Sequence, residues 1–278
     1  MNVSQAIGIF LNYHGMNSRQ TTLRNHAFVL ARFSHHFGER EPESISSDEI
    51  LSFLTKLTEG RNQSTKRLRY AVLSAFFNFV KSTINPELQN PCGTPMLRKL
   101  FRVSKPTRWK ILDKEVVDEV IFRTVKARNR LMLELMARGG MRVGEVLKLT
   151  PRNIEDRKLL LADPKSGKER EVVYIPQKVA DRLKAYITDR GLGPDQRIFP
   201  ITYQAARAVV KKAGSLVGIH LRAHDLRRHA ATYASRSGTP LEIVSKVIVR
   251  HANLSTTQRY LGKVTDAEAM RWIENLYG

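Results

Sequence analysis

Apolar residues recur every three or four positions along the first third of the chain, which is the spacing that lines one face of an α-helix. The pattern predicts four helices within residues 1–85, with the second beginning at Ser18 and the third at Ser46. Glu49 stands three positions after Ser46, and this pair has the spacing of a capping box. We therefore expect an N-terminal domain of four helices.

The pattern changes after residue 85. Four prolines and a glycine fall within residues 86–108, and they predict a connection between two domains. Helical spacing then returns, interrupted by short apolar and β-branched runs at 159–161 and 171–175 that predict two antiparallel strands. The expected fold is mainly α, with a four-helix N-terminal domain and an α-rich C-terminal domain, residues 109–278, that contains a small antiparallel β-sheet.

The charge of the chain predicts its partner. There are 47 Lys and Arg residues against 26 Asp and Glu, for a formal net charge of +21. A field of this sign attracts polyanions, of which nucleic acid is the commonest soluble example. A basic solvated surface or an anionic membrane is the alternative. Both predicted domains are basic, as expected if both contact the same polyanion.

Composition also removes several classes of protein. The single cysteine, Cys92, excludes an intrachain disulfide and disfavours a cysteine-based zinc site. We expect no metal and no cofactor. No stretch approaches the roughly 18 uninterrupted apolar residues of a membrane span, and the N-terminus lacks a secretory signal pattern. We therefore expect no membrane partner and a cytoplasmic, nucleoid-associated location.

Residues suited to phosphodiester chemistry lie in the C-terminal half. In-line attack builds negative charge on nonbridging oxygens, and the planar fork of arginine binds such oxygens in pairs, so Arg142 and Arg227 are candidates for a clamp. Tyr260 is a candidate nucleophile. A tyrosine titrates near ~10 and needs a proton acceptor, for which histidine is suited. Lys165 or Lys168, on a predicted hairpin turn, is a candidate donor to the leaving sugar oxygen.

Four segments resemble the motifs of the tyrosine recombinases, or phage integrase family. The segments are ARGGMRVGE at 137–145, PKSGKER at 164–170, HDLRRHAAT at 224–232 and HANLSTTQRY at 251–260. Each motif is weak by itself, but the four in this order are specific. The resemblance covers about residues 3–265. It implies that the N-terminal domain is a SAM-like core-binding domain that contacts DNA and that the C-terminal domain is catalytic.

The resemblance also implies a mechanism without a metal or cofactor. Tyr260 attacks the scissile phosphate to form a 3′-phosphotyrosyl link, and the 5′-hydroxyl of a partner duplex later reverses the attack. Arg142 and Arg227 hold the phosphate, and Lys165 is the acid for the leaving oxygen. The implied function is site-specific recombination for integration, excision or resolution of DNA elements.

Two histidines and a glutamate complete the expected site. The resemblance implies that His224 assists proton transfer and that His251 supports the phosphate or the transition state, whereas Glu145 is expected to support the site without reacting. The family often has glycine immediately before the final histidine, and this chain has Arg250. Arg250 is expected to be tolerated if its side chain reaches solvent or DNA.

Basic residues outside the motifs are candidate DNA contacts. One group lies in the first turns of the predicted fourth helix, where positive charge does not complement the helix dipole. This group consists of Lys66, Arg67 and Arg69, for which a solvated face is the alternative. A second group is expected to face the major groove from a helix at 203–213 and consists of Gln204, Arg207 and Lys211.

The residues after Tyr260 predict an assembly. From Asp266 onward, apolar residues recur at helical spacing, in a helix too short to be stable alone in water. These residues are Ala267, Met270, Ile273 and Leu276. The resemblance to the tyrosine recombinases implies docking on a neighbouring protomer, in a homotetramer on paired double-stranded DNA sites or in an assembly with a related recombinase. Packing on its own domain is the alternative.

Two other classes of protein remain open from the sequence. A type IB topoisomerase shares the tyrosine chemistry but relaxes DNA as a monomer without strand exchange. A non-catalytic DNA-binding protein with a relic site is the other alternative. Covalent trapping on nicked DNA separates the second class from an enzyme, and strand exchange separates the first from a recombinase.

Overall fold

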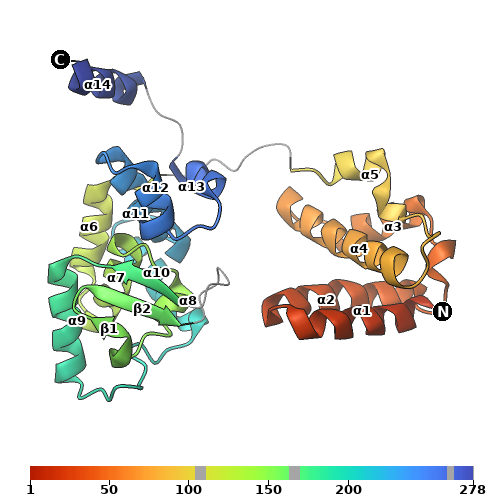
Figure 1. Cartoon of the computed structure of the whole chain (residues 1–278), viewed down its shortest axis with the longest axis horizontal. Helices are drawn as coiled ribbons and strands as arrows, with labels where there is room; N and C mark the ends of the chain where they lie inside the picture. The colour runs from red at the N-terminus through yellow and green to blue at the C-terminus, as the bar shows by residue number, and fades with distance from the viewer. Residues whose placement is uncertain (104–110, 163–169, 262–265, 278) are drawn as a thin grey trace. The chain divides into compact units, whose positions relative to one another are not determined.

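The chain is described by a computed structural model over residues 1–103, 111–162, 170–261 and 266–277 (Figure 1). It divides into two compact units, residues 1–107 and 108–278. The described elements are mainly helices with one small antiparallel sheet, so the fold class predicted from the sequence is confirmed.

Four long helices enclose the core of the first unit. Their bounds are α1 (Val3–Asn17), α2 (Gln20–Phe37), α3 (Ser47–Leu57) and α4 (Gln63–Thr83). The apolar faces meet in a core that includes the fully buried rings of Phe10, Phe33, Phe76 and Phe77. The predicted capping box is present at α3, where Ser46 and Glu49 bond each other's backbone N–H groups.

The start of α2 differs from the prediction. Ser18 ends α1, where its backbone N–H donates to the His14 carbonyl at 2.8 Å, and α2 begins after Arg19 without a side-chain cap. A serine suits both a helix N-cap and a tight helix end, because its hydroxyl bonds nearby backbone or side-chain groups in either place. Here its hydroxyl lies 3.2 Å from His14 Nδ1.

Much of the segment that the prolines predict as a connection belongs to the first unit. A 3₁₀ turn (Pro91–Gly93) packs against α3 and α4, and α5 (Pro95–Leu100) packs against that turn. Leu88, Cys92, Leu97 and Phe101 are buried in the same core. Each proline stands at the first position of its short helix, where a missing N–H has no consequence. Burial raises the pKa of the Cys92 thiol to about 12. Cys92 is a core residue.

The second unit is built around α7. Its described elements are α6 (Lys114–Arg123), α7 (Ala127–Arg138), α8 (Val143–Val146), β1 (Ile154–Glu155), β2 (Lys158–Ala162), β3 (Arg170–Tyr174), α9 (Gln177–Asp189), α10 (Tyr203–Ser215), α11 (Ala223–Arg236), α12 (Leu241–Ile243), a π-helical turn (Val244–Ile248), α13 (Leu254–Leu261) and α14 (Asp266–Tyr277). Every residue from Leu131 to Ala137 is buried. Helix α7 therefore forms the centre on which α6, α9 and α11 pack (Figure 1).

The sheet and a pair of glycines set the backbone around α7. The described strands are antiparallel in the order β1-β2-β3, with Leu159 opposite Val173. After α7 the chain turns at Gly139 and Gly140, and Gly140 has a φ of +60°. A Cβ on Gly140 would fall 2.6 Å from the carbonyl oxygen of Ile248. Glycine is required there because two backbone segments, 139–142 and 248–251, approach each other closely.

Candidate active site

Five of the six predicted catalytic residues lie in the described part of the chain, and they come from four segments. Arg142 precedes α8, His224 and Arg227 lie in the first turns of α11, His251 follows the turn after the π-helical segment, and Tyr260 lies near the end of α13. Lys165, the sixth, is outside the described residues. Because the 139–142 turn and the 248–251 turn meet above α11, residues far apart in sequence share one site.

The Tyr260 hydroxyl is paired with a histidine. Its oxygen lies 2.6 Å from His224 Nε2, and the rings of His224 and His251 both stand edge-on to the tyrosine ring at centroid distances of 5.2 and 4.8 Å. Burial, together with the nearby Arg228 and Arg227 guanidiniums, lowers the pKa of His224 to about 4. His224 is therefore neutral at pH 7, and its Nε2 accepts the phenolic hydrogen bond.

His251 is oriented by two buried hydroxyls. Its Nδ1 lies 2.9 Å from Thr257 Oγ1, and the Thr257 hydroxyl donates to Ser245 Oγ at 2.8 Å. Since the Thr257 proton is directed to Ser245, the Thr257 oxygen accepts from Nδ1–H, which leaves Nε2 of neutral His251 unprotonated. Burial and the Arg227 and Arg142 guanidiniums lower the pKa of His251 to about 4.

We expect removal of the Thr257 hydroxyl to slow the chemistry that His251 supports. Thr257→Val keeps the shape of the side chain but leaves Nδ1 of His251 and the Ser245 hydroxyl without their partner, at a cost of about 1–3 kcal/mol for a buried polar group. Thr257→Ser should restore most of the rate. The measurement is single-turnover strand cleavage, and equal rates for Thr257→Val and the wild type would contradict this role.

The two histidines also predict a pH dependence. Their pKa values are lowered in the folded chain to about 4, whereas an unfolded histidine titrates near ~6.5. Between these values the unfolded state binds more protons, so stability that is present above about pH 6.5 is lost as pH falls toward 4. An NMR titration of the histidines in the DNA-free chain should show that His224 and His251 are still uncharged at pH 5.5. Midpoints near the ordinary value would contradict this expectation.

Arg227 is a buried guanidinium. It is 1% exposed, and its two terminal nitrogens donate to the carbonyl oxygens of Gly140 and Val249. These bonds attach α11 to both turns that carry the site. Burial first, and then the neighbouring Arg142 and Arg250, lower the Arg227 pKa to about 9. The group still carries its charge at pH 7.

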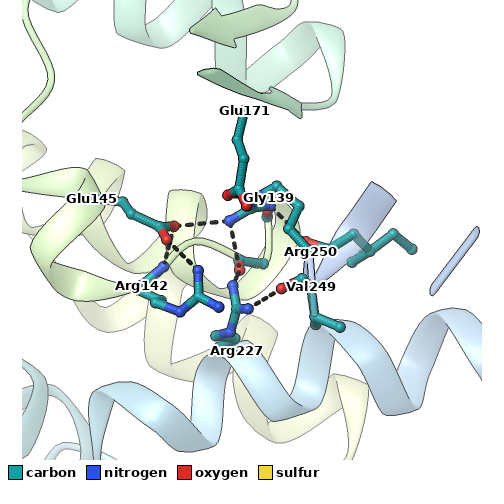
Figure 2. Close-up of polar contacts among 9 residues, drawn as sticks. Gly139, Arg142, Glu145, Glu171, Arg227, Val249 and Arg250 are labelled. Carbon is teal, nitrogen blue, oxygen red and sulfur yellow. Dashed lines mark hydrogen bonds and ion pairs between the residues drawn. The ribbon is translucent and has the colours of Figure 1, made fainter. Parts of the chain in front are cut away.

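Arg142 is held by a buried carboxylate. Its Nη1 donates to Glu145 Oε1 at 2.5 Å, and its backbone N–H donates to Glu145 Oε2 at 2.8 Å. Burial alone raises the pKa of Glu145, but the Arg250 and Arg142 charges and bonds outweigh it, so that pKa lies below its usual range. Glu145 is thus an ionised support that orients Arg142, whose side chain remains a quarter exposed (Figure 2).

Arg250 does not extend to solvent or DNA, so that expectation is wrong. The residue is 5% exposed and adopts a left-handed backbone with a φ of +47°. Its Nη2 donates to Glu145 Oε2 at 2.8 Å, and its Nε lies 3.3 Å from Glu171 Oε2. The side chain turns inward because two buried carboxylates attract it, and Figure 2 shows it between them.

A second arginine that the sequence did not predict lies beside Tyr260. Arg228 is buried, donates to Asp225 at 3.1 Å, and has its guanidinium carbon 5.5 Å from the centroid of the Tyr260 ring. It is also the second largest cause, after burial, of the lowered His224 pKa. Its position one residue after Arg227 was the available signal, but a helix normally turns successive residues to different faces.

The predicted DNA contacts occupy two places. On α10, Gln204, Arg207 and Lys211 line a hollow of about 440 Å³ that is also lined by His224. On α4, Lys66 and Arg67 lie in the first turns. The third residue of that group, Arg69, has its guanidinium carbon 4.1 Å from the centroid of the Phe28 ring.

Within the described ranges, no group of three or more His, Cys, Asp or Glu residues is placed to hold a metal ion. Among the helices of these same ranges, none is both long and apolar enough to cross a membrane.

A neutral histidine on a tyrosine hydroxyl, with Arg142 and Arg227 nearby, is an arrangement suited to nucleophilic phosphoryl transfer. Residues 110–266 match the phage integrase family, and residues 9–89 match the N-terminal SAM-like domain of phage integrases. The first match alone covers more than half of the chain. The chain therefore belongs to the phage integrase family, the tyrosine recombinases, as the sequence motifs predict.

Relatives and solved structures agree with this assignment. The chain is 26% identical over 300 residues to tyrosine recombinase XerA of Pyrococcus furiosus, covering 99% of this chain and 97% of that protein. It is 27% identical over 256 residues to tyrosine recombinase XerA of Thermococcus onnurineus, covering 88% of this chain and 85% of that protein. Its fold matches the Tn1549 transposon integrase in complex with circular intermediate DNA, with a TM-score of 0.79, 15% identity and 99% of both chains covered. The match to XerH site-specific recombinase bound to difH substrate has a TM-score of 0.75 and 18% identity, and it covers 99% of this chain and 96% of that chain.

Proposed function

We propose that this chain is a site-specific recombinase that cleaves and rejoins double-stranded DNA through a 3′-phosphotyrosyl intermediate at Tyr260, in integration, excision or resolution of DNA elements. The observation that carries the proposal is the 2.6 Å contact between the Tyr260 hydroxyl and His224 Nε2. The contact joins a nucleophile to its proton acceptor, and the arginines beside it supply charge for a phosphate. The names of the relatives and the DNA complexes of the structural neighbours support the same class.

Each side chain has a role in the proposed reaction. The Tyr260 oxygen attacks phosphorus as its proton passes to His224, and the bond from phosphorus to the 5′ oxygen breaks. Arg142 and Arg227 stabilise the charge that develops on the nonbridging oxygens. We assign Lys165 as the acid that protonates the leaving oxygen. The 5′-hydroxyl of a second strand then attacks the phosphotyrosine and releases Tyr260, so no bond energy is lost and no cofactor is needed.

His251 acts on the same phosphate in this proposal. Its unprotonated Nε2 is available to accept a proton or hydrogen bond, because Nδ1 is directed to Thr257. The tyrosine ring lies against both histidines. Movement of α13 would therefore change the nucleophile and the support of His251 together, since Thr257 and Tyr260 lie on that helix.

DNA is proposed to contact both domains. The α10 residues Gln204, Arg207 and Lys211 line the hollow that reaches His224, which supports a DNA path beside the scissile phosphate. In the N-terminal unit, the basic group on α4 is proposed to bind backbone phosphates. Many such contacts make affinity fall steeply with salt, because each releases counterions from DNA.

The experiment that tests the function begins with covalent trapping. The chain is incubated with a fragmented genomic DNA library, denatured, and the DNA attached to protein is sequenced. Recovery of a defined sequence is expected, and exchange of strands between two labelled duplexes carrying that sequence should follow. Relaxation of supercoiled DNA without strand exchange would indicate a topoisomerase, and the absence of covalent complexes would contradict the enzymatic assignment.

A tetramer on paired DNA sites, in a cytoplasmic and nucleoid-associated location, is the proposed working assembly. Helix α14 offers a surface for it, because Met270 and Ile273 are 71% and 59% exposed. Trp272 on the same helix lies against Gly238 of its own unit. Apolar side chains left exposed on an amphipathic helix favour contact with a neighbour. A related recombinase is an alternative neighbour.

Removal of α14 should separate binding from assembly. A chain that ends at Lys263 is expected to bind a single half-site with near wild-type affinity, because the active-site elements described above precede it. Cooperative binding to paired half-sites and strand exchange should be lost. Both are measured by gel shift and recombination assay on the recovered sequence, and wild-type cooperativity in the truncated chain would refute the role of α14.

A further inference from the structure

Arg250 is a buried cation that joins several backbone segments of the C-terminal unit. Its Nη2 donates to Glu145 on α8 at 2.8 Å, its Nη1 donates to the Ile248 carbonyl at 2.7 Å, and its Nε lies 3.3 Å from the carboxylate of Glu171 on β3. Figure 2 shows the side chain between the two carboxylates. Since a buried carboxylate without a cation is costly, Arg250 is part of how this site is held together.

Glu145 connects Arg250 to Arg142. One carboxylate oxygen of Glu145 accepts from Arg142 Nη1, and the other accepts both from the Arg142 backbone N–H and from Arg250 Nη2. The negative charge of Glu145 is therefore shared between two guanidiniums. Without Arg250, Arg142 would be drawn more strongly toward this buried carboxylate and away from a bound phosphate.

Arg250 contributes both a positive charge and a structural bridge, and the two contributions can be removed separately. Arg142 and Arg250 pair with Glu145 and Glu171, and Arg227 interacts with the charges of Arg142, Arg250 and Glu145. These three cations and two carboxylates leave one net positive charge for the phosphodiester anion. Removal of Arg250 alone makes the network neutral. Removal of Arg250 together with the charge of Glu171 keeps the net positive charge and deletes only the bridge.

We propose that Arg250 is a positioning residue for strand cleavage, which acts through Glu145 to set the direction of the Arg142 guanidinium and attaches that pair to strand β3 through Glu171. The inference rests on the proposed function and deepens it. Arg250 does not contact the reacting atoms in this role. It fixes Arg142, which is proposed to contact the reacting phosphate. A small displacement of a catalytic group is sufficient to slow a reaction strongly.

The test compares single-turnover cleavage of a nicked duplex that carries the recovered sequence. The informative variant is R250G/E171Q, because glycine adopts the left-handed backbone freely and the buried pair is removed as a whole. We expect its cleavage rate to fall about 10- to 100-fold, the scale of a misplaced catalytic group, with DNA affinity near that of the wild type. R250G alone, in which Glu171 lacks this partner, is expected to lose folding stability as well.

A double-mutant cycle with R142A decides how Arg250 acts. If Arg250 acts through Arg142, R250G/E171Q should add little to the loss already caused by R142A. The matched control is R182Q/E134Q, which removes another ion pair with a buried carboxylate, 2.7 Å apart, and should cleave at the wild-type rate. An equal loss in both Arg142 backgrounds, or wild-type cleavage by R250G/E171Q, would overturn the inference. Failure of the wild-type chain to cleave would instead overturn the proposed function, and the inference with it.

Discussion

Replacement of Tyr260 by phenylalanine will abolish covalent protein–DNA complexes while DNA binding stays near the wild-type level. The substitution removes one oxygen atom, which is the proposed nucleophile, and keeps the ring against His224 and His251. The expected result is loss of the denaturation-resistant complex on nicked DNA, with an unchanged shift of the same DNA on a native gel.

A second tyrosine provides the control for this experiment. Tyr233 lies on α11, is partly exposed and stacks on His229 at a centroid distance of 5.7 Å. Tyr233→Phe should form covalent complexes at the wild-type rate, because its hydroxyl is not expected to take part in the reaction. A complex that persists in Tyr260→Phe, for example through Tyr277, would refute the assignment of the nucleophile.

The helical framework follows from local sequence, and so the sequence alone was sufficient to predict it. The apolar spacing within residues 1–85 predicts four helices, and α1 to α4 are present. The capping box at Ser46 was predicted because both partners lie within one turn. The proline-containing segment was misread for a tertiary reason. Its prolines and glycine interrupt the helical pattern locally, and this suggested a linker. However, Leu88, Leu97 and Phe101 pack on helices formed by residues distant in sequence.

The candidate catalytic residues could be predicted because each lies in a motif with a characteristic spacing. The residues that hold them in place could not be predicted in this way. His251 is held by Thr257 and Ser245, which interact only after α13 packs on the π-helical turn. Arg250 is 105 residues from Glu145, and nothing in its neighbours indicates that it turns inward. The pairing of such residues depends on the close approach of two backbone turns, which Gly140 permits.

The network also explains why the site tolerates so much buried positive charge. Arg227 is bonded to two backbone carbonyls, Arg142 to Glu145, and Arg250 to both Glu145 and Ile248. Charge-assisted bonds of this kind offset the loss of hydration. Burial first, and then these positive groups together with Arg228, lower the pKa values of His224 and His251 and so keep both histidines neutral at pH 7.

Replacement of Arg142 by alanine will slow strand cleavage by about 10²- to 10³-fold, the loss typical of one removed donor to a developing oxyanion. The fold should survive, because Glu145 keeps its bond to Arg250 and its bond to the backbone N–H of residue 142. The loss should therefore appear in the single-turnover rate, with little change in the unfolding midpoint or in DNA affinity.

Arg142→Lys tests whether charge alone is sufficient. Lysine keeps the positive charge but lacks the planar fork with which Arg142 contacts Glu145 and is proposed to bind a phosphate oxygen at the same time, so it should recover only part of the lost rate. The comparison is made on the nicked duplex at a fixed salt concentration, with folding followed by thermal unfolding. A cleavage rate within a fewfold of the wild type for Arg142→Ala would mean that Arg227 alone holds the phosphate, and the two-arginine clamp would have to be abandoned.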